Sequence, residues 1–132
     1  MIESQNRHRL LRLEQHSPFG VKPPVIYEIR TYEAAEGMAA AMRDRFISVV
    51  ASKFFPRHGI ELLGAFVAPS EDGRFTYMTR FASEEARKKA WDAFAADPEW
   101  AKVKAETEKN GPLLKNQSIS ILSPAMSGLV LA

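Results

Sequence analysis

The chain has 132 residues, a length that suits one domain built around a single hydrophobic core. Its 18 Lys and Arg residues against 16 Asp and Glu residues give a formal net charge of +2, with the two signs interspersed, so we expect no nucleic-acid partner. The absence of cysteine excludes disulfides, a thiolate nucleophile and a zinc–thiolate site, and allows a reducing compartment. No apolar run approaches the roughly 18 residues of a membrane span, so we expect a soluble, cytoplasmic protein without a membrane partner.

Residues 1–24 are interpreted as an N-terminal extension. Three arginines interleave with three leucines there, as in a transit peptide, but two glutamates and the lack of a secretory apolar core argue against targeting. We expect an extension that packs on a partner subunit or stays mobile.

Residues 25–32 (VIYEIRTY) predict the first strand, because β-branched and aromatic residues recur with a period of two. The more apolar face is expected to lie under helices and consists of Val25, Tyr27, Ile29 and Thr31. The other face is expected to be free of helices and consists of Ile26, Glu28, Arg30 and Tyr32.

Residues 38–57 predict the first helix, which ends near His58 because Gly59 suits the left-handed position that follows a helix. The apolar stripe of this helix consists of Met38, Met42, Phe46, Val49 and Val50. Ile47 and Phe54 are expected on the flank of the stripe.

The rest of the chain predicts three more strands and two helices. Strands at 60–68 and 75–81 flank an Asp72-Gly73 hairpin turn, and a strand at 118–122 ends the domain. A helix begins after Ser83, and a short one begins at Asp97-Pro98, since both sequences suit a helix N-terminus.

This β-α-β-β-α-β order, with a short extra helix before the last strand, predicts an α+β, ferredoxin-like domain over residues 25–122. The domain has a four-stranded antiparallel sheet with helices on one face, and a C-terminal tail follows at 123–132. Two helices cover only one face of such a sheet. We therefore expect a homodimer in which two sheets pack face to face as a dimeric α/β barrel with a polar lining, and higher oligomers are left open.

The stretches VIYEIRTYEAAEG, YMTRFAS, EEARKKAWDAF and DPEW together resemble the NIPSNAP family of the dimeric α/β-barrel superfamily. The specific combination is E-x-R-x-Y on a strand followed by A-W-x-x-F-x-x-D-P-E-W. The resemblance covers about residues 25–122 and implies a ferredoxin-like fold and a homodimer. It supplies no activity, although distant superfamily members include cofactor-free monooxygenases and haem-degrading enzymes.

Four residues are candidates for catalysis. Glu28, Arg30 and Tyr32 share a face, where a carboxylate beside a guanidinium suits a general base or an anion site. The alternative is an ion pair that fixes the register of the dimer. His58 suits a proton relay or, alternatively, an interaction with the negative end of the preceding helix.

Four further residues are candidates for ligand binding, namely Tyr77, Arg80, Trp91 and Trp100. With Phe94, the aromatic members suit a pocket for a planar aromatic or isoprenoid ligand, or else belong to the core. Arg80 is expected near the face of the first strand that carries Glu28 and Arg30, if the strand at 75–81 pairs with it. Arg87 is expected to stack on the indole of Trp91.

No phosphate-binding loop, metal-ligand spacing or nucleophile motif is present, so no cofactor and no metal are expected. Two functions remain. The first is small-molecule binding or cofactor-independent catalysis of the oxygenase or isomerase type, in a barrel or a sheet–helix cavity. The second is a non-catalytic dimeric protein-interaction module. A pocket with converging polar side chains favours the first, and a filled interior with every polar group paired favours the second.

Overall fold

A computed structural model describes residues 25–70 and 72–126. The predicted extension at 1–24 and residues 127–132 of the predicted tail lie outside the described residues. The elements in chain order are β1 (Ile26–Ala34), α2 (Ala39–Arg45), η2 (Phe46–Phe54), α3 (Phe55–Arg57), β2 (Glu61–Val67), β3 (Arg74–Phe81), α4 (Glu84–Ala95), α5 (Pro98–Thr107) and β4 (Leu114–Leu122).

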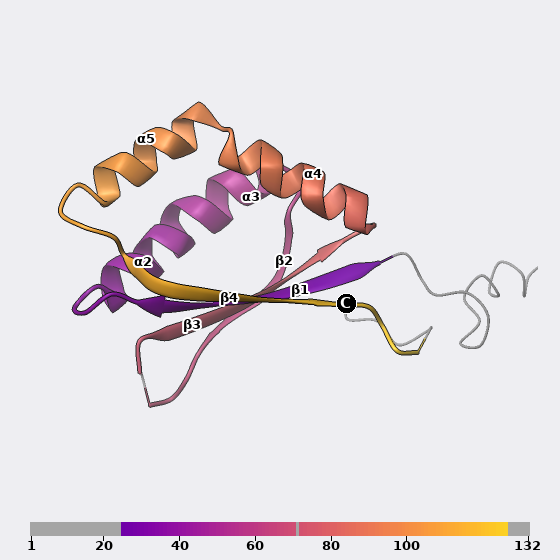
Figure 1. The fold of residues 1–132 in the computed structure, drawn as a ribbon, viewed down its shortest axis with the longest axis horizontal. Coiled ribbons are helices and arrows are strands. Elements are labelled where there is room, and N and C mark those ends of the chain that lie inside the picture. Colours follow the sequence, from indigo (N-terminus) through magenta and orange to yellow (C-terminus); the bar gives the residue numbers. More distant parts are fainter. Residues whose placement is uncertain (1–24, 71, 127–132) are drawn as a thin grey trace, which may run out of the picture.

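The four strands form one antiparallel sheet in the order β2-β3-β1-β4. The helices all lie on one side of it (Figure 1). The predicted ferredoxin-like α+β fold is therefore confirmed, as is the hairpin between β2 and β3. β4 begins at Leu114 and not at Ser118, because its polar first half continues the pairing with β1 as far as Ala34.

The sequence-based assignment of the two faces of β1 was wrong. Register places Glu28 opposite Thr79, Arg30 opposite Tyr77 and Tyr32 opposite Phe75, and directly paired residues share a face. These residues of β3 are buried, and Phe75 and Tyr77 belong to the core formed with the helices. Glu28, Arg30 and Tyr32 therefore point toward the helices. Tyr27, Ile29 and Thr31 lie on the helix-free face, meaning the side of the sheet that no described helix covers.

The first helix runs without a break through α2, η2 and α3, and it combines α-helical and π-helical turns. Its middle segment, η2, is a π-helix, whose wider turn keeps side chains four residues apart on one face. Met42, Phe46, Val50 and Phe54 are consequently all buried. Phe54 was expected on the flank of the stripe, and the π-helical winding is the reason that it is fully buried instead.

The predicted helix ends are confirmed. Ser83 Oγ accepts a hydrogen bond from Ala86 N at 3.0 Å, and Asp97 Oδ1 accepts one from Glu99 N at 2.9 Å. Gly59 has a φ of 71°, which residues with a side chain rarely adopt. Ser83 and Asp97 thereby fix the starts of α4 and α5, the two helices that face β1 across the site described next.

Candidate functional site

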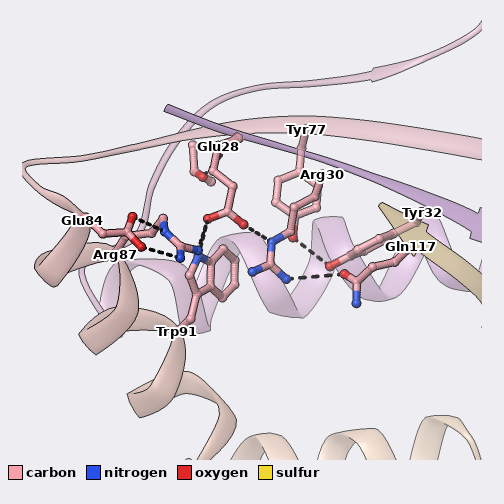
Figure 2. Close-up of polar contacts among 9 residues, drawn as sticks. Glu28, Arg30, Tyr32, Tyr77, Glu84, Arg87, Trp91 and Gln117 are labelled. Carbon is pink, nitrogen blue, oxygen red and sulfur yellow. Dashed lines mark hydrogen bonds and ion pairs between the residues drawn. The ribbon is translucent and has the colours of Figure 1, made fainter. Parts of the chain in front are cut away.

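The carboxylate of Glu28 is the centre of a buried polar network (Figure 2). The side chain is 0% exposed. Its Oε1 accepts hydrogen bonds from Arg87 Nη1 at 3.0 Å and from Trp91 Nε1 at 2.8 Å, and its Oε2 is ion-paired with Arg30 Nε. Both oxygens are thus occupied, so Glu28 serves to hold the two arginines and the indole of Trp91 in place.

Arg30 lies between this network and an open cleft. Its guanidinium stacks on the indole of Trp91, with Cζ 3.8 Å from the ring centroid, and its Nη1 donates to Gln117 Oε1 at 3.4 Å. From the sequence, Arg87 was expected on this indole. Arg87 instead bridges Glu28 and Glu84, because Glu84 lies one turn before it on α4.

Two tyrosines adjoin Arg30 on the same face of the sheet. The hydroxyl oxygens of Tyr32 and Tyr77 are 2.8 Å apart, and Tyr77 is 0% exposed. Burial raises the pKa of both phenols, well above the usual value for Tyr77. For Tyr32, the hydrogen bond from Tyr77 and the positive charges of Arg30 and Arg45 oppose this rise in pKa. Both phenols are therefore protonated at neutral pH.

A cleft of about 590 Å³ opens between the sheet and the helices. Its aromatic and aliphatic wall includes Tyr32, Met42, Phe46, Val50, Trp91, Phe94, Trp100 and Leu114. Its charged and amide groups are Arg30, Arg45, Asp92, Lys104, Glu108 and Gln117. At its mouth, Arg45 Nη1 donates to Thr107 Oγ1 at 3.0 Å and to Glu108 Oε2 at 2.7 Å, which connects the first helix to the end of α5.

The structure brings most of the predicted site residues together. Arg30, Tyr32, Trp91 and Trp100 line the cleft, Tyr77 lies behind Tyr32, and Glu28 lies behind Arg30. The two tryptophans also pack against the core.

Arg80 and His58 lie elsewhere. Arg80 pairs in register with Tyr27, so it is on the helix-free face, and its Nη2 is 2.7 Å from Glu61 Oε2. It was expected beside Arg30, which was wrong because neighbouring positions on β3 alternate between the two faces. His58 is not among the residues that line the cleft, and its Nε2 is 2.7 Å from Asp97 Oδ2.

Asp97 connects the end of the first helix to the start of α5. Besides His58, it contacts Arg57 Nη1 at 2.9 Å, and Arg57 also reaches Glu99 at 3.0 Å. The hydrogen bond from His58, helped by Arg57 and the Glu99 backbone N–H, holds the pKa of Asp97 well below its usual range. The ionised carboxylate is therefore favoured in the folded state.

Asp97→Asn should lower the free energy of unfolding at pH 7 while keeping the helix cap, because asparagine also caps helices. A carboxylate whose pKa is depressed on folding stabilises the fold above the unfolded-state pKa of about 4, and this contribution is lost as the pH falls below it. The difference between wild type and variant should therefore shrink as the pH falls from 5 toward 2. Urea unfolding across this range measures it, and a difference that grows on acidification would contradict the assignment.

Five charged or amide residues that line the cleft were not predicted from the sequence, namely Arg45, Asp92, Lys104, Glu108 and Gln117. The available signal for Arg45 was its place three residues after Met42, next to the apolar stripe. Gln117 could be placed only through the pairing of β4 with β1, which sets it opposite Tyr32.

Residues 25–70 and 72–126 contain neither a metal-binding cluster of acidic, histidine or cysteine side chains nor a membrane-spanning helix. No group of three or more His, Cys, Asp or Glu side chains there is arranged to hold a metal ion. None of the helices in this part of the chain is long and apolar enough to cross a membrane.

The strand order, the single helical layer and the cleft beneath it define a small ferredoxin-like α+β protein. The NIPSNAP family profile matches residues 27–127, and the chain belongs to the NIPSNAP family. The resemblance given by the sequence motifs is thereby confirmed. No match was found among curated protein sequences.

Solved structures with the same fold include other members of this family. An uncharacterised NIPSNAP-like domain protein from Burkholderia xenovorans is 21% identical, with a TM-score of 0.66 over 77% of this chain and 86% of that one. A NIPSNAP family protein of unknown function from Agrobacterium tumefaciens is 22% identical, with a TM-score of 0.67 over 83% and 96%. SnoaB, a cofactor-independent oxygenase from Streptomyces nogalater, is 12% identical, with a TM-score of 0.56 over 80% and 97%.

Proposed function

We propose that this NIPSNAP protein binds a planar aromatic small molecule in the cleft between β1 and the helices, and acts on it without a cofactor, as an oxygenase or isomerase. The observation that carries the proposal is the cleft itself. Its volume of about 590 Å³ falls within the range of about 300–1,000 Å³ typical of ligand sites. Aromatic rings form its wall, while Arg30, Tyr32 and Arg45 converge on it.

The support for cofactor-independent catalysis comes from the polar groups of the cleft and from the fold. Protonated phenols and guanidinium groups stabilise negative charge that develops on a substrate oxygen, which is what proton abstraction beside a carbonyl requires. SnoaB, which shares the fold, is a cofactor-independent oxygenase. At 12% identity that likeness concerns the fold alone, so it supports the feasibility of such chemistry on this scaffold and assigns no residue.

The proposal includes a homodimer formed through the helix-free face. Phe66, which is 58% exposed, lies there opposite Thr76, and Leu122 lies there opposite Tyr27. A second copy would remove these apolar side chains from water. The cleft opens on the other side of the sheet, so binding and dimerisation use different surfaces.

A second candidate is the non-catalytic dimeric module, which would hold another protein through its outer helices. Ile47 favours it, because this side chain on η2 is 57% exposed. The two candidates differ in whether the cleft is occupied by a small molecule.

Native mass spectrometry of gently purified protein tests the proposal. We expect a dimer that carries a small aromatic molecule, and Arg30→Ala should lose that molecule while remaining dimeric at low concentration in sedimentation. Arg30→Lys and a melting curve separate loss of binding from loss of fold. Arg74→Ala is the matched control, since the side chain of this exposed arginine makes ion-pair and hydrogen-bond contacts only with Asp72 among the described residues.

If wild-type protein carries no small molecule and a panel of two- and three-ring aromatic compounds leaves its tryptophan fluorescence unchanged, aromatic binding is refuted. If Arg30→Ala dissociates the dimer while retaining the molecule, Arg30 serves assembly and the second candidate is favoured.

A further inference from the structure

The hydrogen bond between the two tyrosines has a defined direction. Tyr77 is fully buried, and among the residues that the structure describes its hydroxyl meets one hydrogen-bond partner, the oxygen of Tyr32. A buried hydroxyl proton without an acceptor is costly, so Tyr77 donates to Tyr32. The proton of Tyr32 must then point away from Tyr77. Because Tyr32 lines the cleft, its O–H is available to an acceptor there.

The same hydroxyl lies in the field of two arginines. The charges of Arg30 and Arg45 both act on the Tyr32 phenol, and both side chains line the cleft. An acceptor on a ligand that meets the Tyr32 O–H is therefore placed where negative charge is favoured.

Both guanidinium groups retain donors for such an acceptor. Arg30 uses Nε for Glu28 and Nη1 for Gln117, and Arg45 uses Nη1 for Thr107 and Glu108. Within the described part of the chain, Nη2 of each arginine meets no acceptor. Guanidinium N–H groups match the geometry of a carboxylate.

The nearby acids offset this positive charge in part, but at the Tyr32 phenol the charges of Arg30 and Arg45 each act more strongly than that of Glu28. Glu28 is occupied by Arg30, Arg87 and Trp91, and Glu108 by Arg45. Asp92 lies at the solvent-exposed edge of the cleft, where Lys104, which has no ion-pair partner among the described residues, also lies.

We infer that the ligand of the cleft is an aromatic carboxylate, whose carboxylate accepts a hydrogen bond from Tyr32 between Arg30 and Arg45 while its rings lie against Trp91, Phe94 and Trp100. This inference rests on the proposed function and names the ligand class of the same site. Tyr77 is a positioning residue that directs the Tyr32 proton toward the ligand.

A pair of probes of matched shape tests it, 2-naphthoate and the neutral 2-naphthamide, titrated into the full chain at pH 7 with tryptophan fluorescence and calorimetry. We expect the carboxylate to bind at least about tenfold more tightly, because a hydrogen bond to a charged group is worth more than a neutral one. Tyr32→Phe and Arg45→Met should each weaken 2-naphthoate about tenfold and weaken 2-naphthamide less, because the amide oxygen is an uncharged acceptor. Melting curves, together with Arg45→Lys, which keeps the charge and should retain most of the binding, show whether a variant is folded.

Equal affinity for the two probes, or tighter binding of the amide, would overturn the carboxylate assignment while leaving aromatic binding in the cleft intact. Binding of neither probe would instead count against the proposed function. An unchanged affinity for 2-naphthoate in both Tyr32→Phe and Arg45→Met would show that the carboxylate is held elsewhere, and would also overturn the inference.

Discussion

Glu28→Ala should lower the free energy of unfolding by about 3–5 kcal/mol, since removing one member of a buried ion pair leaves its partners charged and unpaired. The loss is expected to lie at the upper end here because the carboxylate is 0% exposed and meets three donors. Without it, Arg30 would lose its ion-pair partner, and Arg87 would keep only its pair with Glu84 among the described residues. Urea unfolding at pH 7 measures the difference from wild type.

Two further variants serve as comparisons for the destabilisation expected from Glu28→Ala. Glu28→Gln keeps one carbonyl acceptor but removes the charge, so it should fall between wild type and Glu28→Ala. Glu106→Ala removes an exposed glutamate whose partner, Lys109, lies one turn away on the surface, and should leave the unfolding curve almost unchanged. If Glu28→Ala is no more damaging than Glu106→Ala, Glu28 is not the centre of the buried network.

Phe46→Ala should also lower the free energy of unfolding by about 3–5 kcal/mol, the usual cost of truncating a buried phenylalanine. The ring is 2% exposed and packs against other aromatic rings, with centroid distances of 4.6 Å to Tyr77, 4.8 Å to Phe75 and 5.5 Å to Phe55. Because Phe46 also lines the cleft, its removal would enlarge that space and loosen the support of Tyr77.

The adjacent residue is the matched control. Ile47 lies on the same π-helix but is 57% exposed, so Ile47→Ala should change the free energy of unfolding by no more than about 0.5 kcal/mol. Thermal and urea unfolding of both variants, with circular dichroism to confirm retained helix, compare them directly. Equal losses from the two would show that the helix is rotated relative to the sheet, with Phe46 outside the core.

The sequence predicted the order and type of the elements because each carries a local signal. Alternation marked the strands, and the residues Ser83, Asp97 and Gly59 marked helix ends through backbone chemistry that does not depend on the rest of the fold. The start of β4 was missed because its first half is polar, and its pairing with β1 is a tertiary property.

The orientation of β1 was not predictable from its own residues. Both faces of this strand mix apolar and polar groups, and counting apolar side chains chose the face of Tyr27 and Ile29. The deciding factors are non-local: the aromatic residues of β3 that pair with Arg30 and Tyr32, and the donors from α4 that make a buried Glu28 tolerable.

The candidate site likewise combines features that local sequence patterns predict with features that depend on the tertiary fold. The motif E-x-R-x-Y placed three of its residues on one face, and the later tryptophans were predicted to line a pocket, but their convergence on one cleft depends on how α4 and α5 cross the sheet. The π-helical turn that fully buries Phe54 likewise has no clear mark in the sequence, because a spacing of four also fits an ordinary helix.

The two sides of the cleft differ in how firmly they are built. β1 is hydrogen-bonded to a strand on each side, so Arg30 and Tyr32 cannot shift without disturbing two ladders at once. α5, by contrast, has no fully buried residue and is held by the packing of Trp100 against Phe54 and Phe94 and by polar groups near its ends. The cleft thus joins a rigidly held sheet surface to a less firmly held wall, and under the proposed function substitutions at exposed positions of α5 would change the outline of the accepted molecule at little cost to folding.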